Sequence, residues 1–420
     1  MLPINQYNAG FRIASGAFKS SPIPSLLVDA GELPLDFYRQ MLLAQYWHRV
    51  QRIPSSLASQ AILNDKFFKF YDNHPRCPKP FGYRAFKLFE ELCIPRMKVH
   101  PFKYSVVPPW KLPSVEHCEW YLGKTHDMGD EILRLSFLKH LEDHHNSAMV
   151  FTNGSKSSAG VGFGAIFPDF NRSGRLLDQS SIFTAEAYAI LTALKEISSR
   201  QKGKYVIFSD SQSTLLALEN FNSNHPIIVE ILEWLYLTEA NGCSISFCWS
   251  PAHVGIVGNE KADALAKAAS TSVSIIQHPL PVNDTKPIIR STVFSSWQFF
   301  WDLENQKMKE IAVSIKPWKY SPMIRRKEVV LSRLRIGHTR LTHGFLMNKE
   351  PQPFCEDCLV PLTVRHLLAE CPSLLDARNK YFSGCKANDG SFMLSRILGF
   401  DFKEDCLFNF IKEVGLLGNI

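Results

Sequence analysis

The sequence predicts an α/β domain at the centre of the chain, between residues 146 and 270, with mainly helical regions on both sides of it. Three observations predict this fold class. Short apolar runs typical of buried strands occur at 148–152, 205–209 and 245–249. Segment 160–167 carries apolar residues at every second position, as the returning strand of a β-hairpin does. Stretches 187–197 and 262–269 repeat apolar residues at helical spacing.

The composition is that of folded domains. The 420 residues are 45% hydrophobic and 21% charged, which suits two or three globular domains rather than a disordered chain. The formal net charge of +7 favours a nucleic-acid partner only weakly, because many soluble proteins reach a similar charge.

The cysteines and the apolar runs indicate a cellular compartment. Ten cysteines are spread along the chain without a compact disulfide framework. The N-terminus lacks the charged and then apolar pattern of a secretion signal. No apolar run approaches the roughly 20 residues that are needed to cross a bilayer. We therefore expect an intracellular protein, nuclear or cytoplasmic, that is neither secreted nor embedded in a membrane.

The regions before the central domain differ in proline content. Residues 1–64 are expected to be helical, because their apolar residues recur at helical spacing between prolines. Residues 65–145 are rich in proline and aromatic residues and are expected to form a connector without long helices. Apolar residues within 131–141 predict one short helix there, to which we assign no function.

The central domain is expected to place acidic residues where its elements meet. Strand 148–152 ends in Asn153-Gly154-Ser155, which predicts a turn. Thr184 is a plausible N-cap, which puts Glu186 in the first turn of a helix. Strand 205–209 is followed directly by Asp210.

A third acid follows the last strand. After the loop 250–258, Asn259 is a plausible N-cap and leaves Asp263 in the early turns of a helix. In an α/β sheet, strand ends and helix starts on one side form the usual ligand crevice. We therefore expect Glu186, Asp210 and Asp263 to be candidates for a shared metal site that supports hydrolysis.

Each of these acids also has a purely structural explanation. Glu186 would interact favourably with a helix dipole, Asp210 could cap the next helix, and Asp263 could pair with Lys267 at helical spacing. Taken one at a time these explanations are as good as a functional one. The order and spacing of all three acids together favour a site.

The region after the central domain is expected to begin with a proline-rich linker, residues 271–288, followed by a basic helical region, residues 289–420. A helix is predicted at 289–309, with Trp297, Phe300, Trp301 and Leu303 on its core side.

A strip of cations follows: Lys316, Lys319, Arg325, Arg326, Lys327, Arg333, Arg335 and Arg340. Trp318, Tyr320, His338 and His343 are interleaved with it as stacking candidates. Such a strip is either a solvated face or a set of phosphate contacts, and Arg326 and Arg333 would share one helix face.

A cysteine and histidine motif lies at 355–371. Cys355, Cys358, His366 and Cys371 have the spacing C-x2-C-x7-H-x4-C. Three thiolates and one imidazole form a closed tetrahedral Zn²⁺ site, which is structural because it has no open position. The alternative is a set of unrelated thiols beside a core histidine. Cys385 and Cys406 lie outside the spacing and are expected to be free thiols.

Four sequence motifs in the central domain occur in a familiar order. They are AMVFTNGSK, FTAEAYAILTALKEI, VIFSDSQSTLLAL and CWSPAHVGIVGNEKADALAKAA. The domain resembles a type 1 ribonuclease H domain. The resemblance implies a five-stranded mixed sheet flanked by helices. It also implies hydrolysis of the RNA strand of RNA/DNA hybrids by two Mg²⁺ (or Mn²⁺) ions held by four carboxylates.

The resemblance assigns roles to particular residues. Glu186, Asp210 and Asp263 match three of the four carboxylate positions, and His253 matches a mobile loop histidine. Asn153 stands where the family has an aspartate. Asparagine is neutral and has an NH₂ group that a cation repels. The resemblance therefore implies a catalytic set of Asn153, Glu186, Asp210, His253 and Asp263 with impaired cleavage.

The flanking regions carry a second resemblance. The stretch FRIASGAFKSSPIPSLLVDAGELPLDFYRQMLLAQYWHRV is similar to the end of the reverse-transcriptase region in non-LTR retrotransposons of the Jockey and I type. VVLSRLRIGHTRLTHGFLM followed by CEDCLVPLTVRHLLAECP resembles their C-terminal zinc knuckle. The sequence contains no Tyr-x-Asp-Asp, so the polymerase palm is missing. These resemblances imply a C-terminal fragment of a larger polyprotein.

Three functions are compatible with the sequence. The first is an active hybrid-specific ribonuclease. The second is a catalytically dead protein that still binds hybrid or single-stranded nucleic acid. The third is a protein-interaction remnant without a nucleic-acid role. Metal binding would separate the first from the second, and salt-dependent nucleic-acid binding would separate the second from the third.

Overall fold

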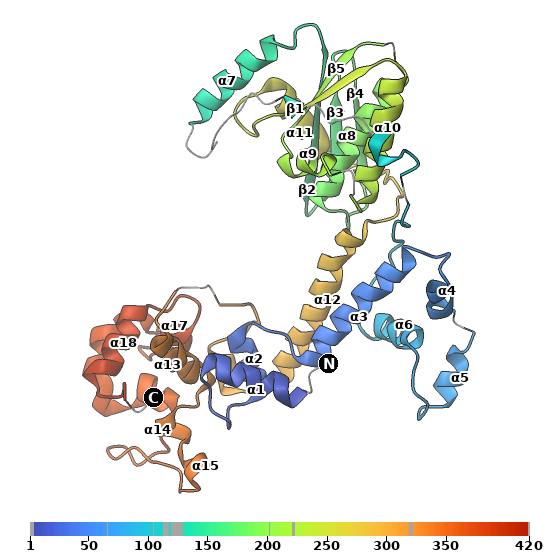
Figure 1. The fold of residues 1–420 in the computed structure, drawn as a ribbon. Coiled ribbons are helices and arrows are strands. Elements are labelled where there is room, and N and C mark those ends of the chain that lie inside the picture. The colour runs from blue at the N-terminus through green and yellow to red at the C-terminus, as the bar shows by residue number, and fades with distance from the viewer. Residues whose placement is uncertain are drawn as a thin grey trace. The chain divides into compact units, whose positions relative to one another are not determined.

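The chain forms two compact units in a computed structural model (Figure 1). The structure describes residues 4–64, 66–103, 105–111, 117–118, 129–200, 202–220, 223–318 and 322–418. The larger unit contains residues 43–290, and the smaller unit joins residues 1–42 to residues 291–420. The unit boundaries fall inside helices α3 (Leu35–Gln51) and α12 (Val282–Leu303).

A mixed β-sheet lies at the centre of the larger unit (Figure 1). Its main strands are β2 (Ala148–Ser157), β3 (Gly160–Ile166), β4 (Asn171–Leu176), β5 (Lys204–Ser209) and β6 (Ser244–Trp249). Their order is β6-β5-β2-β3-β4. Strand β3 is antiparallel to both β2 and β4, and β5 is parallel to both β2 and β6. The predicted five-stranded mixed sheet is therefore confirmed. A two-residue strand, β1 (His117–Cys118), adds to the sheet beside β6 from the region expected to be a connector.

Helices cover both faces of the sheet (Figure 1). They are α7 (Asp130–Glu142), α8 (Ile182–Ser198), α9 (Gln212–Leu218), α10 (Pro226–Ala240) and α11 (Val257–Ser270). Because side chains alternate along a strand, Val150 packs with α8 and α10, whereas its neighbour Phe151 packs with α7 and α11. The apolar face predicted for α8 is buried in the core that contains Val150, between the sheet, α8 and α10.

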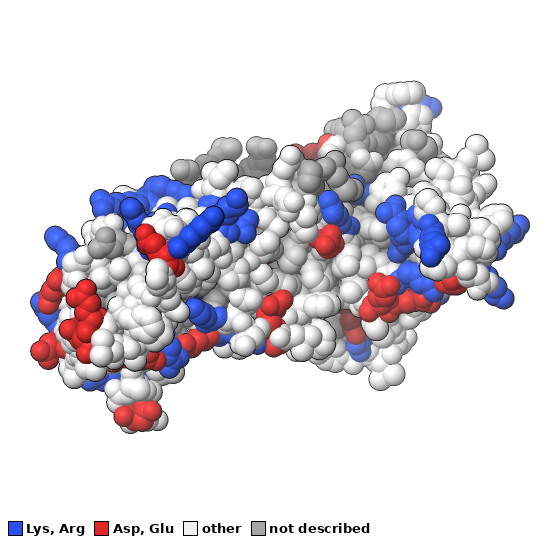
Figure 2. Space-filling model, turned by 90° about the horizontal axis from the view of Figure 1, so that it is seen from below, with Lys and Arg blue, Asp and Glu red and all other residues white. Residues whose placement is uncertain are grey.

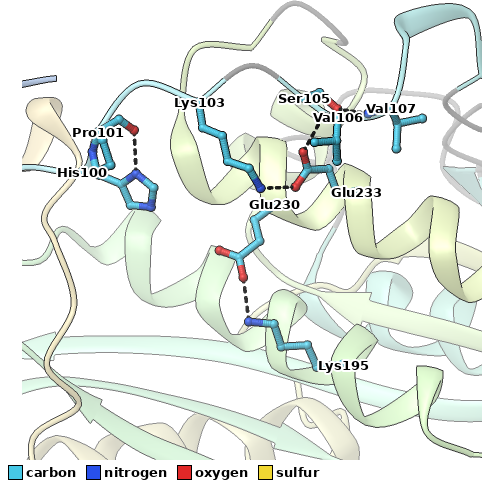
Figure 3. A network of polar contacts seen from close by, with 9 residues as sticks. All are labelled: His100, Pro101, Lys103, Ser105, Val106, Val107, Lys195, Glu230 and Glu233. Carbon is cyan, nitrogen blue, oxygen red and sulfur yellow. Dashed lines mark hydrogen bonds and ion pairs between the residues drawn. The ribbon is translucent and has the colours of Figure 1, made fainter. Parts of the chain in front are cut away.

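Residues 100–103 and 105–107 form a strap that lies across α10 (Figure 3). Lys103 Nζ pairs with Glu233 Oε2 at 3.0 Å, and the backbone N–H of Val106 donates to Glu233 Oε1 at 2.9 Å. Glu233 is buried, so these two contacts satisfy both of its carboxylate oxygens. Lys195 of α8 pairs with Glu230 of α10 at 2.7 Å and ties the two helices together.

The N-terminal and C-terminal regions are mainly helical, as the sequence predicts, and short helices also form within residues 65–145, the region expected to be a connector. In the larger unit the helices before the sheet are α4 (Leu57–Leu63), α5 (Phe68–Asn73) and α6 (Phe81–Glu91), with a 3-10 turn η1 (Pro109–Lys111). The short helix expected within 131–141 is α7. No helix in the described part of the chain is long and apolar enough to cross a membrane.

The smaller unit consists of helices and short helical turns. The helices are α1 (Ile4–Ser15), α2 (Ile23–Ala30), α13 (Arg325–Ile336), α14 (Arg340–His343), α15 (Phe345–Asn348), α16 (Leu375–Phe382), α17 (Leu394–Leu398) and α18 (Glu404–Glu413). The turns are η3 (Lys307–Glu310), η4 (His366–Glu370), η5 (Pro372–Leu374) and η6 (Ser383–Cys385). Segments from the two ends of the chain pack together here, because Ser332 of α13 donates to Asp29 of α2 at 2.5 Å.

The helix predicted at 289–309 begins earlier than expected. Helix α12 starts at Val282 and contains Pro287, so the predicted linker loses its last residues to the helix. Pro287 is the sixth residue of α12, just past the first turn, so the helix lacks the N–H group that would donate to the carbonyl of Asn283. Trp297 and Trp301 are buried as predicted, but Phe300 and Leu303 are exposed and do not form part of a core.

The predicted basic strip is only partly a free surface. Arg335 is buried, donates to Leu398 O at 2.9 Å and stacks 3.8 Å from the centroid of Trp318. Arg333 donates to Gly16 O at 2.9 Å, so it does not share an open face with Arg326. Lys327 pairs with Glu404 at 2.6 Å. His338 and His343 stack on each other at 3.7 Å. Lys319 and Tyr320 lie outside the described residues.

Basic and acidic side chains lie close together on the surface. Figure 2 shows, on one face, groups of Lys and Arg with Asp and Glu beside them. The cations of α13 are therefore not a strip of phosphate contacts as a whole, because several of them are used to hold the smaller unit together.

Candidate functional site

Asn153 lies in the middle of strand β2 and is buried. It pairs with Gly164 across the β2–β3 hairpin, and the strand continues to Ser157. The prediction of a turn at Asn153-Gly154-Ser155 is therefore wrong. Gly154 serves a close approach instead, because a Cβ atom there would lie 2.6 Å from the backbone nitrogen of Glu186. This approach brings β2 against the start of helix α8.

Glu186 is the fifth residue of α8 and is buried. The helix begins one turn earlier than predicted, because Ser181 is the N-cap and accepts a hydrogen bond from the N–H of Thr184. Glu186 Oε2 has no hydrogen-bond partner among the described residues. Burial raises the pKa of Glu186 well above its ordinary value, the nearby charge of Asp210 raises it further, and the Gly154 N–H acts in the opposite direction.

Asp210 follows strand β5 and accepts two hydrogen bonds on one oxygen. Asn153 Nδ2 donates to Asp210 Oδ2 at 2.8 Å, and Asn259 Nδ2 donates to the same oxygen at 3.2 Å. Burial raises the pKa of Asp210, while these two amide hydrogen bonds act in the opposite direction. The backbone carbonyl of Asp210 accepts from Trp249 Nε1 at 3.2 Å, which fixes the end of β5 against β6.

Asp263 and His253 lie close enough to affect these carboxylates. The charge of Asp263 raises the pKa of both Glu186 and Asp210, and His253 lowers that of Asp210. Asp263 is the seventh residue of α11, and its carboxylate pairs with Lys267 Nζ at 2.5 Å. The ion pair that the helical spacing of Asp263 and Lys267 allows is thus present. The structure brings all five predicted catalytic residues into one neighbourhood.

Asn259 is a site residue that sequence reasoning missed. The sequence predicts it as the cap of helix α11, but Ile256 is the N-cap and Asn259 is a buried residue inside the helix. The signal in the sequence is its spacing, since Asn259 lies four residues before Asp263 and shares a helix face with it. Its amide also faces Asp210, so two amide N–H groups converge on one carboxylate oxygen.

The acidic group only partly fits a metal ion. Glu186 Oε2 is a buried oxygen without a described partner, which suits a cation. Two N–H donors point at Asp210 Oδ2 and Lys267 holds Asp263, which opposes a cation at those oxygens. Among the described residues, these three acids do not form a set whose ligand atoms all lie within 4.8 Å of one another. The residues present fit one ion better than a bridged pair.

A second candidate site lies in the smaller unit. Cys355, Cys358, His366 and Cys371 place one ligand atom each within 4.8 Å of one another, so they could hold a metal ion. The sulfur atom of Cys371 lies 3.9 Å from that of Cys355 and 3.8 Å from that of Cys358. His366 Nε2 is buried and has no described partner. The side chain of His366 lowers the pKa of Cys355 to about 7, which favours the thiolate form that metals require. Burial and the neighbouring Cys371 instead raise the pKa of Cys358 to about 12.

A tight turn and a short helical turn bring these four residues together. The Cys355 N–H donates to Val360 O at 2.9 Å, and Leu359 has a positive φ of 54° that closes the turn after Cys358. Phe354 and Pro361 pair as an antiparallel bridge. The turn brings Cys355 and Cys358 to the same side, and η4 and the residue after it supply His366 and Cys371.

Comparison with known families concerns the central part of the chain. Residues 145–271 match the family model described as RNase H. The matched residues include β2 to β6 and helices α8 to α11, and with them Asn153, Glu186, Asp210, His253 and Asp263. Residues 145–271 of this chain form an RNase H domain.

Proposed function

We propose that this protein binds RNA/DNA hybrids through its RNase H domain and cleaves the RNA strand only weakly. The observation that carries the proposal is the 2.8 Å hydrogen bond from Asn153 Nδ2 to Asp210 Oδ2. An aspartate at position 153 would present two anionic oxygens, whereas asparagine presents an N–H group to its acidic neighbour. The substitution removes one negative charge and turns a possible ligand oxygen of Asp210 into a hydrogen-bond acceptor.

The remaining residues have defined parts in this proposal. When bound, Mg²⁺ or Mn²⁺ would polarise a phosphodiester and supply an activated water. Glu186, Asp210 and Asp263 would hold such an ion through their carboxylates. Glu186 would also contact the RNA 2′-hydroxyl, the group that distinguishes RNA from DNA. His253 lies in the exposed loop before α11, where it would assist the transfer of protons or the departure of product.

Restoring the acid at position 153 tests the proposal. Asn153→Asp should increase Mg²⁺-dependent cleavage of a labelled RNA/DNA hybrid by at least about 10²-fold, the usual effect of one well-placed electrostatic group. Asn153→Asp combined with Asp210→Asn is the matched control and should remain slow. Equal cleavage by the wild-type chain and the Asn153→Asp variant would sink the proposal.

One chemical control accompanies this experiment. Asn153 precedes Gly154, and asparagine before glycine is the sequence in which side-chain deamidation is easiest. The wild-type preparation must therefore be checked by mass spectrometry of the peptide around Asn153, which has to show an unmodified amide. This measurement excludes activity from chains in which deamidation has produced an aspartate.

The alternative is a protein that binds hybrid and has no cleavage activity. The ion pair between Lys267 and Asp263 favours this alternative. The site already lacks the negative charge of an aspartate at position 153, and Lys267 neutralises the carboxylate of Asp263 as well. Mn²⁺ binding followed by magnetic resonance distinguishes the two functions. A weak enzyme binds an ion in the RNase H domain and a dead one does not, with the Asp210→Asn variant as the blank.

We further propose that Cys355, Cys358, His366 and Cys371 bind a structural Zn²⁺ ion and that the chain derives from a retrotransposon polyprotein. The first part is supported by the converging ligand atoms of these four residues. The second part rests on the sequence resemblance of the regions on both sides of the RNase H domain. The division into regions 1–64, 65–145, 146–270, 271–288 and 289–420 stays a prediction.

A further inference from the structure

The larger unit contains a polar cavity outside the group of acidic residues, which we call the cationic cavity. It has a volume of about 390 Å³, and its lining includes Arg49, Arg52, His100, His225 and Lys286. The rest of the lining consists of Asn and Ser residues with two prolines and one valine, and none of the described lining residues is Asp or Glu. The cations come from segments far apart in the sequence, so the fold rather than the local sequence gathers this charge.

The two arginines and the lysine of this cavity have no acidic partners among the described residues. Arg49, Arg52 and Lys286 form no ion pair there. Arg52 is held in place instead, because its Nη2 donates to Asn224 O at 3.0 Å and its guanidinium lies 5.1 Å from the centroid of Phe102. Burial lowers the pKa of Arg52. Cations that share a cavity without counter-charges repel one another, so an anion bound there would be stabilised.

A helix N-terminus adds to this positive potential. Helix α10 begins at the cavity, where His225 is the N-cap and makes no side-chain capping hydrogen bond. Pro226 occupies the first helical position, and the first turn contains no acidic residue. The free N–H groups and the dipole of a 15-residue helix favour an anion at this end.

The nearest acid is directed elsewhere. Asp284 lies in the first turn of α12 and partly offsets the desolvation of His225, whose pKa burial lowers to about 4. Its Oδ2 accepts hydrogen bonds from the Ser181 N–H at 3.0 Å and from Thr184 Oγ1 at 2.7 Å. Asp284 is buried against the start of α8 and is not part of the cavity lining.

The same contacts locate the cavity relative to the RNase H site. The ring of His225 lies 4.9 Å from that of Phe183, centroid to centroid, and Phe183 is three residues before Glu186. Residues three apart lie on the same face of a helix, so the cationic cavity lies beside the first turns of α8, the part of the helix that carries Glu186. His100 reaches the cavity from the strap that Figure 3 shows across α10.

We propose that the cationic cavity binds a backbone phosphate of the nucleic acid held by the RNase H domain. The inference rests on the proposed hybrid binding and adds a contact to it. Arginine forks, a lysine and helix N–H groups are the donors that phosphates accept. Arg49, Arg52, His100 and Lys286 lie outside residues 145–271, so the flanking regions supply most of this contact.

Charge reversal in the full-length chain tests the inference. Arg49→Glu and Lys286→Glu are compared with the matched control Lys204→Glu. Lys204 is exposed and is the first residue of β5, at the end of the strand remote from Asp210. Hybrid affinity is measured by fluorescence anisotropy across a KCl series, and thermal unfolding confirms that each variant is folded. The slope of log affinity against log salt should become shallower by about 0.9 for each phosphate that the variant no longer neutralises.

The outcomes separate this inference from the proposed function. Shallower slopes for Arg49→Glu and Lys286→Glu, with a wild-type slope for Lys204→Glu, support it. Equal slopes for all three variants, or wild-type slopes throughout, overturn it. Inorganic phosphate serves as a second probe. If phosphate raises the melting temperature of the wild-type chain but not of Arg49→Glu, while hybrid affinity is unchanged, the cavity takes a free phosphate and the inference is overturned. A wild-type chain that binds no hybrid overturns the proposed function as well.

Discussion

Gly154 sets the distance between strand β2 and helix α8. An added Cβ atom would lie 2.6 Å from Glu186 N and 2.9 Å from the carbonyl carbon of Ala185, both of which are backbone atoms that cannot rotate away. Gly154→Ala should therefore lower the free energy of unfolding of the larger unit by about 1–3 kcal/mol, the usual cost of overpacking. Gly129→Ala is the control, because no atom lies within 4 Å of its added Cβ. Chemical denaturation measures both variants, and similar stabilities would contradict the prediction.

His48 makes the stability of the larger unit depend on pH. It is buried against Phe89, and burial lowers its pKa from 6.5 to about 4. The unfolded chain binds the proton more readily than the folded chain between these values. Stability should therefore be complete above pH 6.5 and should fall as the pH falls towards 4, by up to about 3 kcal/mol.

Replacing this histidine isolates its contribution. His48→Leu should show a weaker loss of stability between pH 7 and pH 4 than the wild-type chain, as measured by urea unfolding at each pH. Other buried histidines in this unit, such as His225 and His278, contribute the same slope to both proteins. Identical pH profiles would show that His48 carries no part of the dependence.

At the scale of single residues, the sequence predicts which acidic residues lie near one another better than it predicts their local backbone conformation and hydrogen bonds. Glu186, Asp210 and Asp263 lie near enough for charge to raise the pKa values of the first two, as strand ends and helix starts at one sheet edge allow, but the shared metal site expected of them stays a prediction. The turn predicted at Asn153-Gly154 is absent, since the same dipeptide that favours turns also permits close packing of backbone. The cap predicted at Asn259 is absent because a side chain's tertiary partner, here Asp210, cannot be read from local spacing.

Helix α8 depends on the cap at its first turn. Ser181 accepts from the Thr184 N–H at 3.1 Å, while Asp284 accepts from the Ser181 N–H and from Thr184 Oγ1. Ser181→Ala should lower stability by about 1 kcal/mol, the typical value of an N-cap. Ser198→Ala, at the other end of the same helix, removes only a hydrogen bond to Lys195 O and should change stability by less than about 0.5 kcal/mol. Thermal unfolding of both variants provides the measurement, and an equal effect would rule out the capping role.

Element boundaries are the weaker part of the sequence prediction. The strands at 148–152, 205–209 and 245–249 are present within β2, β5 and β6. Helix α8 starts before Thr184 because Ser181 competes for the cap, and helix α12 starts before Pro287 because its first turn is anchored by Asp284. Both starts are decided by tertiary hydrogen bonds, which apolar periodicity does not reveal.

At the scale of the whole molecule, local patterns could not pair the ends of the chain. The smaller unit joins residues 1–42 to residues 291–420 through contacts such as Ser332 with Asp29. Arg335 and Arg333 form part of the same packing, which explains why the expected basic strip is not a continuous free surface. Three cations without acidic partners among the described residues, Arg49, Arg52 and Lys286, lie together in the cationic cavity of the larger unit.

The cysteine and histidine cluster is expected to control the folding of the smaller unit. Zinc binding and folding are thermodynamically coupled, because the four ligands converge only in the folded chain. Purified protein should contain one zinc ion per chain by elemental analysis. Chelation should lower the melting temperature of the smaller unit or remove its unfolding transition. The transition of the larger unit should be unchanged once Mg²⁺ is restored, because the two units have separate cores.

Two cysteine variants decide whether the metal rather than the thiol is responsible. Cys371→Ser should abolish zinc binding and the zinc-dependent transition, since three ligands hold the ion far less tightly than four. Cys385→Ser, in the same unit but outside the cluster, should retain both. Because Cys371 is buried, its replacement alone could disturb packing. The Co²⁺ absorption spectrum therefore gives an independent readout, with a tetrahedral thiolate spectrum expected in the wild type and in Cys385→Ser only. A wild-type chain without zinc or such a spectrum would show that the four residues are ordinary core thiols beside a buried histidine.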